Sequence, residues 1–390
     1  MKTLCSTATG EILTGGQDAM LNRWHVEDGS EGSVLTPAAP PLPHSYWVTA
    51  VASLAPNSHP LFPLGLTICG ARDNLIRLYD MQGNVLQCLS GHEKPPVSFS
   101  WTKDFQLVSG SWDGTARVWD LESGECKLTL GGHENAVNVL CLTENETSQA
   151  NLLATVSSGE SVNSKPANFK LRIWSLTTGE QVTTPIEDHA GSIRSIFRIP
   201  GTGFATTSND GSVLVRSSLD SGGGGSVNTF LHPPQVGGEG YPPFVLGGSA
   251  VDLSLLTSSA ADATGFATCG EDGTVVVWKG TELEQVLPHP SSVWAVCSLS
   301  PPNKPPKGSA SSGWYGCDIA TAGHDGFLRV FSCDPVRNSK PLAVAMQNDL
   351  DQEIAEAQAR LNKGPSSEEI AAAPKWEDRG GLPGTSESQV

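Results

Sequence analysis

The segment from Ser109 to Asp113 contains residue types that could perform acyl transfer. A serine becomes a nucleophile when a histidine takes its proton and a carboxylate orients that histidine. Ser109 or Ser111, with His92 and Asp113, could supply these three groups. However, residues 110–114 read Gly-Ser-Trp-Asp-Gly, so the serine does not stand at the centre of the G-x-S-x-G turn in which hydrolases hold their nucleophile.

The aspartate of this segment belongs to a pattern that recurs along the chain. In each copy an Asp, or once an Asn, stands six residues before an aromatic residue, or once an Arg. The copies begin at Asp18, Asp73, Asp113, Asn168, Asp210, Asp272 and Asp325. They are 55, 40, 55, 42, 62 and 53 residues apart, and one four-stranded propeller blade takes about 40 to 45 residues. The repeats predict an all-β fold, a seven-bladed β-propeller.

A histidine opens an alternating apolar segment before most of the copies. The histidines at this position are His44, His92, His133, His189 and His289. His92 precedes Asp113 by 21 residues, and His189 precedes Asp210 by the same interval. Because a constant interval implies a constant contact, these pairs are expected to touch within their blades.

These motifs resemble the WD-repeat family, whose blades contain a buried hydrogen-bonded network of His, turn Asp, Ser or Thr, and Trp. The resemblance implies such a network for His92, Asp113, Trp119 and either Ser109 or Ser111. A buried indole N–H needs an acceptor, and a hydroxyl can relay a hydrogen bond. Since the constellation recurs whereas an active site occurs once, we expect an architectural role and no enzyme activity.

Composition and charge narrow the kinds of partner. The 390 residues include 42 Gly and 27 Pro but only 17% charged residues, which favours short strands and turns over long solvated helices. The net charge of -17 would repel a nucleic-acid backbone or an anionic membrane surface. We therefore expect a protein partner, with no nucleic acid and no membrane.

Nothing in the sequence indicates a cofactor or a metal site. The nine cysteines form no C-x-x-C motif, and their odd number argues against a complete disulfide framework. The first residues lack the apolar core of a signal peptide, and no apolar run is long enough for a membrane helix. The expected compartments are the cytoplasm and the nucleus, with the cysteines reduced.

A propeller offers a face for binding, and the residue before each turn Asp should project at one rim of its channel. These residues are Gln17, Arg72, Trp112, Ala167, Asn209, Glu271 and His324. Trp112 is a candidate interface anchor because Trp is enriched at binding hot spots; the alternative is that it packs against its own neighbouring blade. The same two alternatives apply to Trp47 and Trp294, for which the core is the more frequent place.

The expected domain organisation follows from helix-capping signals and from segments rich in Gly and Pro. We expect the propeller over 1–335, a linker over 336–347, a short amphipathic helix over 348–363 capped by Asn348, and a disordered acidic tail over 364–390. Insertions poor in core-forming residues are expected as loops that protrude from the blades, at 34–43, 157–168, 221–243 and 300–313.

Several segments outside the generic repeat resemble the phospholipase A-2-activating protein family of ubiquitin-binding WD-repeat proteins. They are "LPHPSSVWAV" at 287–296, "SGSWDGTARVW" at 109–119, "GFLRVF" at 326–331, the acidic helix, and "LPGT" at 382–385. Members of the family continue into a second ubiquitin-binding domain and a helical domain that docks on an AAA unfoldase. This chain stops at Val390, so contact with the unfoldase is expected only indirectly or through domains that this sequence does not contain.

The resemblance implies a non-catalytic adaptor that binds ubiquitin or ubiquitylated proteins in protein degradation and ubiquitin recycling. An acidic surface with an exposed aromatic residue would complement ubiquitin's apolar patch and its basic surroundings. The alternative is a WD-repeat scaffold subunit of an unrelated complex, since a fold does not fix a function. Only about ten residues precede "EILTGG", so no N-terminal strand is expected to complete the seventh blade.

Overall fold

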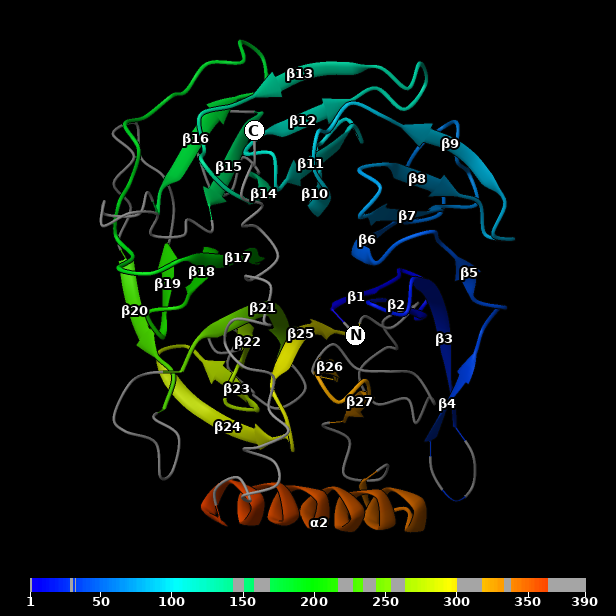
Figure 1. Cartoon of the computed structure of the whole chain (residues 1–390), viewed down its shortest axis with the longest axis vertical. Helices are drawn as coiled ribbons and strands as arrows, with labels where there is room; N and C mark the ends of the chain where they lie inside the picture. Colours follow the sequence, from blue (N-terminus) through cyan, green and yellow to red (C-terminus); the bar gives the residue numbers. More distant parts are fainter. Residues whose placement is uncertain are drawn as a thin grey trace, which may run out of the picture.

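Each sequence repeat forms one antiparallel sheet, because its apolar residues alternate along strands that short Asp-containing turns connect. In the computed structural model the seven sheets stand as blades around a central channel, and one helix lies outside the ring (Figure 1). The prediction of a seven-bladed propeller is confirmed. The structure describes residues 2–28, 31, 33–142, 151–157, 169–216, 227–233, 243–253, 264–299, 318–332 and 338–363.

The first three blades each contain at least four strands in sequence order. Blade one has β1 (Thr3–Ser6), β2 (Ile12–Gly15), β3 (Met20–Asp28), β4 (Ser33–Pro37) and β5 (Leu42–Pro43). Blade two has β6 (Val48–Leu54), β7 (Leu66–Ala71), β8 (Ile76–Tyr79) and β9 (Val85–Leu89). Blade three has β10 (Pro96–Trp101), β11 (Leu107–Ser111), β12 (Ala116–Trp119) and β13 (Cys126–Leu130).

The next four blades follow the same order around the ring. Blade four has β14 (Val137–Leu142), β15 (Leu152–Ser157) and β16 (Leu171–Ser175). Blade five has β17 (Ile193–Ile199), β18 (Gly203–Ser208), β19 (Ser212–Arg216) and β20 (Val227–Leu231). Blade six has β21 (Val245–Asp252), β22 (Thr264–Gly270), β23 (Thr274–Lys279) and β24 (Glu282–Pro288). Blade seven has β25 (Val293–Ser298), β26 (Ile319–Gly323) and β27 (Leu328–Phe331).

The core lies between neighbouring blades. Ile68 and Leu78 of blade two pack with Leu107 and Trp119 of blade three. Strand β11 is buried along its whole length, whereas the outer strand β13 alternates between half-buried and exposed residues. Because apolar side chains of two sheets share each core, a blade depends on both of its neighbours for burial.

Innermost strands carry a bulge near the end at which they enter the blade. In β25, Val293 pairs with Gly323 and Ala295 with Ala322, so Trp294 is an extra residue without a partner on β26. Similar register shifts occur at the starts of β6, β10, β17 and β21. A bulge redirects a side chain out of the ladder, and these bulges all lie at the end of the blade where the turn Asp is found.

Two expected loops contain strands. Residues 34–43 form β4 and β5, which pair with β3, and β20 lies inside the expected loop at 221–243. The reason is that an outer strand has one exposed face and needs few apolar residues, so its composition resembles that of a loop. Most of the other expected loops lie outside the described residues.

Blade seven has three strands within the described part of the chain, and its sheet has no fourth strand on the outer side of β27. Strand β1 pairs with β2 in blade one. The ring closes instead by packing: Ile12 shares a core with Cys297 and Ala320, and Ser6 Oγ donates to the Ser298 carbonyl over 2.8 Å.

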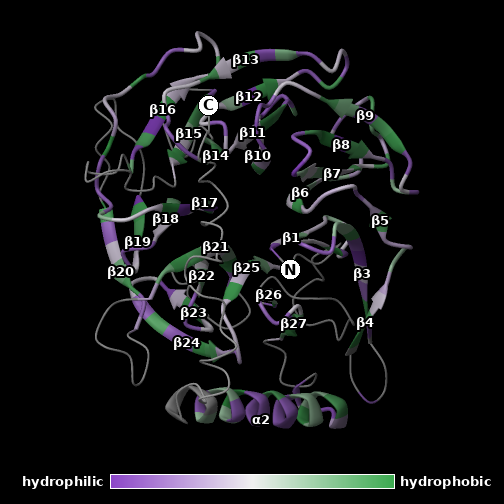
Figure 2. Ribbon diagram, in the orientation of Figure 1, coloured by the Kyte–Doolittle hydropathy of each residue, from purple (hydrophilic) through white to green (hydrophobic). Residues whose placement is uncertain are grey.

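Helix α2 (Pro341–Lys363) lies across the outer side of blade seven (Figure 1). It begins seven residues before Asn348, which was the predicted cap. Proline is favourable in the first helical turn, Ala, Leu and Met favour helix, and the Leu342 N–H donates to the Glu31 carbonyl over 2.9 Å. Figure 2 shows hydrophobic and hydrophilic segments alternating along α2; within its described side chains, Ile354 is the buried one.

Candidate functional site

In blade three a histidine, a serine, an aspartate and a tryptophan form one hydrogen-bonded chain. His92 Nδ1 lies 2.8 Å from Asp113 Oδ2, and His92 Nε2 lies 2.7 Å from Ser109 Oγ. The Trp119 indole N–H donates to the same hydroxyl over 2.8 Å. Ser109 has no exposed surface, so its Oγ relays a hydrogen bond between two buried rings and presents nothing to a substrate.

Ser111 lies outside this chain, and Asp113 organises the turn. The Ser111 hydroxyl donates to the Lys94 carbonyl over 2.8 Å. Asp113 Oδ1 accepts the Thr115 backbone N–H over 2.9 Å. Burial works to raise the pKa of Asp113, but hydrogen bonds from His92 and Thr115 outweigh it and hold the pKa below its ordinary value. The charged carboxylate therefore fixes both the turn and the imidazole.

Blades four and six build the histidine, hydroxyl and indole part of this arrangement around a threonine. The contacts are His133 Nε2–Thr155 Oγ1 at 2.7 Å, Trp174 Nε1–Thr155 Oγ1 at 2.8 Å, His232 Nε2–Thr268 Oγ1 at 2.8 Å and Trp278 Nε1–Thr268 Oγ1 at 2.9 Å. His232 was missed in the sequence because an insertion places it 40 residues before Asp272. Burial lowers the pKa of His133 to about 3 and that of His232 to about 4.

Blade five keeps the histidine network without a tryptophan. His189 Nδ1 lies 3.1 Å from Asp210 Oδ2, and His189 Nε2 lies 2.8 Å from Thr206 Oγ1. Arg216, at the position of the aromatic residue, is buried and pairs with Asp188. An ion pair thus takes the place of the indole at the same point of the blade.

Blades seven and two deviate further. In blade seven, His289 Nε2 lies 2.9 Å from Thr321 Oγ1, and burial lowers the pKa of His289 to about 4. In blade two, His44 Nε2 lies 3.3 Å from Cys69 Sγ and 3.2 Å from the Tyr79 hydroxyl. Six blades therefore hold a buried or half-buried histidine at one position, which is the behaviour of a structural repeat and not of a single active site.

The rim positions occupy equivalent places in their blades. The backbone N–H of Arg72, Trp112 and His324 each donates to a carbonyl at the entrance of the innermost strand, over 2.9, 3.1 and 2.8 Å. Asn209 and Glu271 make the same backbone contact in blades five and six. Gln17 is exposed in blade one, and Ala167 lies outside the described residues. The equivalence places these turns on one face of the propeller.

On this face, side chains from four blades form a row of alternating rings and cations, which we call the indole row: Trp112, Arg72, Trp47, Lys2, Trp294 and His324. The Arg72 guanidinium carbon lies 4.6 Å from the ring centre of Trp47 and 5.6 Å from that of Trp112. Lys2 Nζ lies 5.5 Å from the ring centre of Trp47 and 5.2 Å from that of Trp294. These distances are those of cation–π contacts.

Three members of the indole row were not among the predicted rim residues. For Trp47 and Trp294 the core was the more frequent place, but both are half-buried on this face. Trp294 is there because the bulge in β25 turns it out of the ladder, and its N–H donates to His324 Nδ1 over 3.4 Å. Lys2 carried no signal in the sequence.

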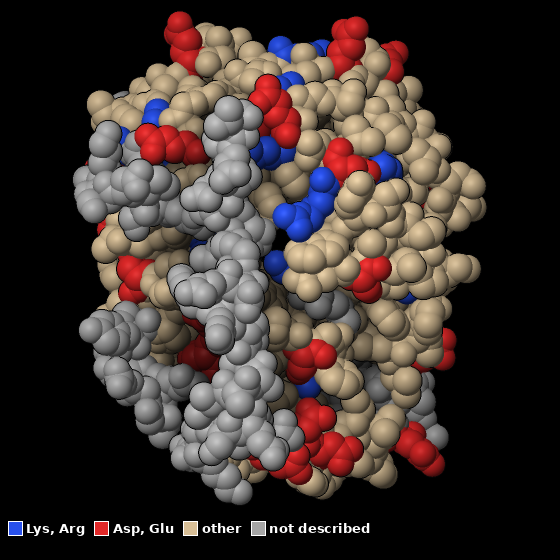
Figure 3. Space-filling view, viewed as in Figure 1, with Lys and Arg blue, Asp and Glu red and all other residues tan. Residues whose placement is uncertain are grey.

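The remaining rim candidates lie apart from the indole row. Asn209 Oδ1 accepts a hydrogen bond from Arg194 over 2.8 Å, and the Glu271 carbonyl accepts one from the Ser292 hydroxyl over 2.6 Å. The face thus has cations and indoles at blades one, two, three and seven and a carboxylate at blade six. Figure 3 shows one side of the propeller, with Lys and Arg side chains beside the central opening and many Asp and Glu side chains spread over the blades.

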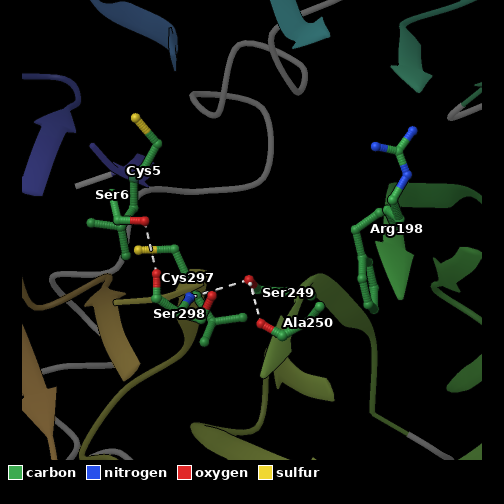
Figure 4. Close-up of a pocket in the computed structure, with 11 residues that line it drawn as sticks. Cys5, Ser6, Arg198, Ser249, Ala250, Cys297 and Ser298 are labelled. Atoms are coloured by element: carbon green, nitrogen blue, oxygen red, sulfur yellow. Dashed lines mark hydrogen bonds between the residues drawn. The ribbon is translucent and has the colours of Figure 1, made fainter. Parts of the chain in front are cut away.

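A cavity of about 380 Å³ lies in the channel, lined by residues of β1, β17, β21 and β25. Figure 4 shows Cys5, Ser6 and Cys297 on one wall and Arg198 on the opposite wall. Burial raises the pKa of the Cys5 thiol to about 12 and that of Cys297 above its ordinary value. Neutral thiols are poor nucleophiles and poor metal ligands, so the cavity offers packing and polar contacts rather than cysteine chemistry.

Within the described residues, no three His, Cys, Asp or Glu side chains are grouped so that they could hold a metal ion. No helix in the same part of the chain has the length and apolar character needed to cross a membrane.

The chain is similar to known proteins at three levels. The family model "WD domain, G-beta repeat" matches residues 83–120, which run from the end of blade two through β12. "Ubiquitin homeostasis protein lub1" of Schizosaccharomyces pombe is 33% identical over 250 residues, which are 64% of this chain and 27% of lub1. "Phospholipase A-2-activating protein" of Xenopus laevis is 38% identical over 95 residues, 24% of this chain and 11% of that protein.

A solved structure agrees with the fold. The WD40 β-propeller domain of Doa1 superposes with a TM-score of 0.61 at 20% identity and covers 86% of this chain and 94% of the Doa1 domain. At this identity the likeness shows the fold alone, and the chain spans about a quarter of the length of lub1. The homologues of this chain thus include lub1, Doa1 and phospholipase A-2-activating protein.

Proposed function

We propose that the propeller is a non-catalytic adaptor that binds ubiquitin or ubiquitylated proteins through the face that carries the indole row. Its role would be to pass modified proteins toward degradation and ubiquitin recycling. The similarity to a protein named for ubiquitin homeostasis supports this assignment. The role of the hydroxyl network as structural support is consistent with an adaptor that performs no chemistry.

The observation on which the proposal rests is the convergence of three indoles on one face. Trp47, Trp112 and Trp294 come from blades two, three and seven, and each keeps part of its ring exposed. Indoles supply large apolar area at little cost in side-chain entropy, which is why they dominate binding hot spots. An apolar patch on ubiquitin would find its complement in these rings.

The distribution of charge on this face would orient bound ubiquitin. The protein has a net charge of -17, and Glu271 is exposed on the face beside blade seven. The Ser292 hydroxyl donates to the Glu271 backbone carbonyl over 2.6 Å, which links the turn of Glu271 to the segment that leads into β25. The basic surroundings of ubiquitin's apolar patch would therefore lie toward blade six, away from Arg72 and Lys2.

The test is an NMR titration of isotope-labelled ubiquitin with the full chain and with three variants. We expect shifts confined to ubiquitin's apolar patch, and weaker binding for Trp112→Ala and Trp294→Ala. Phe105→Ala is the matched control, because Phe105 is an exposed aromatic residue in the turn at the opposite end of blade three. Shifts that are absent at millimolar protein, or that Phe105→Ala weakens equally, would leave a propeller scaffold with another partner.

A further inference from the structure

Two cations in the indole row have no acidic partner among the described residues. Lys2 and Arg72 contact indole rings and form none of the ion pairs that the described side chains make. In the same two blades, Arg23 pairs with Glu11 at 2.7 Å and Arg77 with Asp73 at 2.5 Å. Arg117 of blade three has no described carboxylate partner either, and its Nε is buried without a hydrogen bond. Lys2 and Arg72 are therefore two neighbouring cations without a carboxylate partner in the described part of a chain that has 41 acidic and 24 basic residues.

The nearest carboxylates in the sequence are already engaged. Asp73 follows Arg72 directly but binds Arg77 and the Leu75 N–H. Asp113 follows Trp112 but binds His92 and the Thr115 N–H. Each acid caps its own turn, so neither neutralises the indole row.

The two cations also repel each other. Both lie against the ring of Trp47, and burial together with the charge of Arg72 lowers the pKa of Lys2. Such a pair is less stable empty than with an anion beside it, because an anion would offset the repulsion and the lost hydration together.

The geometry of Arg72 selects the kind of anion. The indole rings of Trp47 and Trp112 both lie near its guanidinium, while its N–H groups make no side-chain hydrogen bond within the described part of the chain. A guanidinium edge binds a carboxylate in its plane through two parallel hydrogen bonds. Lys2, which also contacts Trp47, offers a second donor group for a neighbouring carboxylate.

We propose that the indole row binds an acidic, extended peptide segment of a protein partner, with one carboxylate on the edge of Arg72 and another on Lys2. A peptide fits better than a nucleic acid because the net charge of -17 and the exposed Glu271 on the same face would repel a long phosphate backbone. The few carboxylates of a short peptide interact mainly with the nearby Lys2 and Arg72, because the protein's charges farther away than about 8 Å are screened at physiological salt. The proposal concerns the same face as ubiquitin binding but does not depend on it.

The experiment measures fluorescence anisotropy of a short, labelled, Glu-rich peptide as the full chain is added. A peptide with Gln at every Glu position is the ligand control. We expect the Glu peptide to bind, the Gln peptide to bind at least about tenfold more weakly, and added salt to weaken binding.

Variants then locate the site. Arg72→Gln should weaken the Glu peptide about tenfold and Arg72→Lys less, because lysine keeps the charge but loses the two parallel hydrogen bonds. Lys2→Gln should also weaken it. Lys103→Gln removes the same charge at the opposite end of blade three and should change the affinity less than about twofold. Far-ultraviolet circular dichroism and thermal melting confirm that each variant is folded.

Three outcomes would overturn the proposal: equal binding of the Glu and Gln peptides, an equal effect of Lys103→Gln and Arg72→Gln, or tighter binding of a single-stranded oligonucleotide than of the Glu peptide. Ubiquitin titrations of the same variants separate the two proposals. Peptide binding without ubiquitin binding refutes only the ubiquitin function, and the reverse result refutes only the peptide site.

Discussion

The relay hydroxyl of blade three gives the sharpest test of the structural interpretation. Ser109 Oγ lies 2.7 Å from His92 Nε2 and 2.8 Å from Trp119 Nε1, and all three residues are buried. Ser109→Ala leaves the imidazole nitrogen and the indole N–H without partners in an interior that water does not reach. Each unsatisfied buried group costs about 1–3 kcal/mol, so we expect a loss of about 2–6 kcal/mol in the free energy of unfolding.

Two further substitutions make the prediction specific. Ser111→Ala removes an equally buried hydroxyl that bonds only backbone groups, so its cost should be about 1 kcal/mol. Ser109→Thr keeps the hydroxyl, and threonine is the relay in blades four to seven. The Thr variant should therefore stay within about 1 kcal/mol of the parent protein, which reflects only the extra methyl group.

Urea unfolding followed by tryptophan fluorescence, together with thermal melting, measures these differences. For a domain of more than 300 residues, 1 kcal/mol corresponds to roughly 1.5 °C in Tm, so Ser109→Ala should lower Tm by roughly 3–9 °C. A loss below about 0.5 kcal/mol, which is typical of substitutions away from any such feature, would refute the relay role. So would equal losses for Ser109→Ala and Ser111→Ala.

Three other predictions follow from the geometry. Burial lowers the pKa values of the imidazoles in blades four, six and seven to about 3 to 4. Below about pH 6.5, the ordinary histidine pKa, these side chains bind protons in the unfolded state but not in the folded state. Stability should therefore be complete above about pH 6.5 and fall toward pH 4, by up to about 1.4 kcal/mol per unit for each histidine, and urea midpoints that stay constant across this range would contradict it. A Cβ at Gly110 would lie 2.2 Å from the Val137 carbonyl oxygen of the next blade, whereas one at Gly131 meets nothing within 4 Å; Gly110→Ala should lower stability by more than about 2 kcal/mol and Gly131→Ala should be close to neutral, and similar Tm values for the two would disprove the contact. Ile354→Asp should detach α2 and raise amide hydrogen exchange in the helix, and unchanged protection would mean that Ile354 does not anchor it.

The generic parts of the fold could be predicted because they repeat. Seven copies of the Asp-to-aromatic spacing fix the number of blades, and the 21-residue interval between His92 and Asp113 fixes their contact. Repetition makes a weak local signal strong, since chance does not reproduce one spacing along a whole chain. His232 was missed because an insertion lengthens the interval between it and Asp272, so that it does not fit the repeated spacing.

The choice between Ser109 and Ser111 needed the structure. The two serines are two residues apart on one strand, and the sequence gives both the same distance to His92 within the tolerance of the motif. Only the register of β11 shows that Ser109 faces both His92 and Trp119, while Ser111 lies at the strand end beside the Lys94 carbonyl.

The sequence by itself determined the class of fold, the number of blades, and the contacts of His92 and His189 with their turn aspartates. Tertiary structure decided which side chains meet on that face. Trp47, Trp294 and Lys2 come from three blades and join Arg72 and Trp112 only because the ring closes and brings its first and last blades together. The physical reason is that periodicity encodes contacts within a blade, whereas contacts between distant blades depend on bulges, ring closure and side-chain directions that no local pattern records.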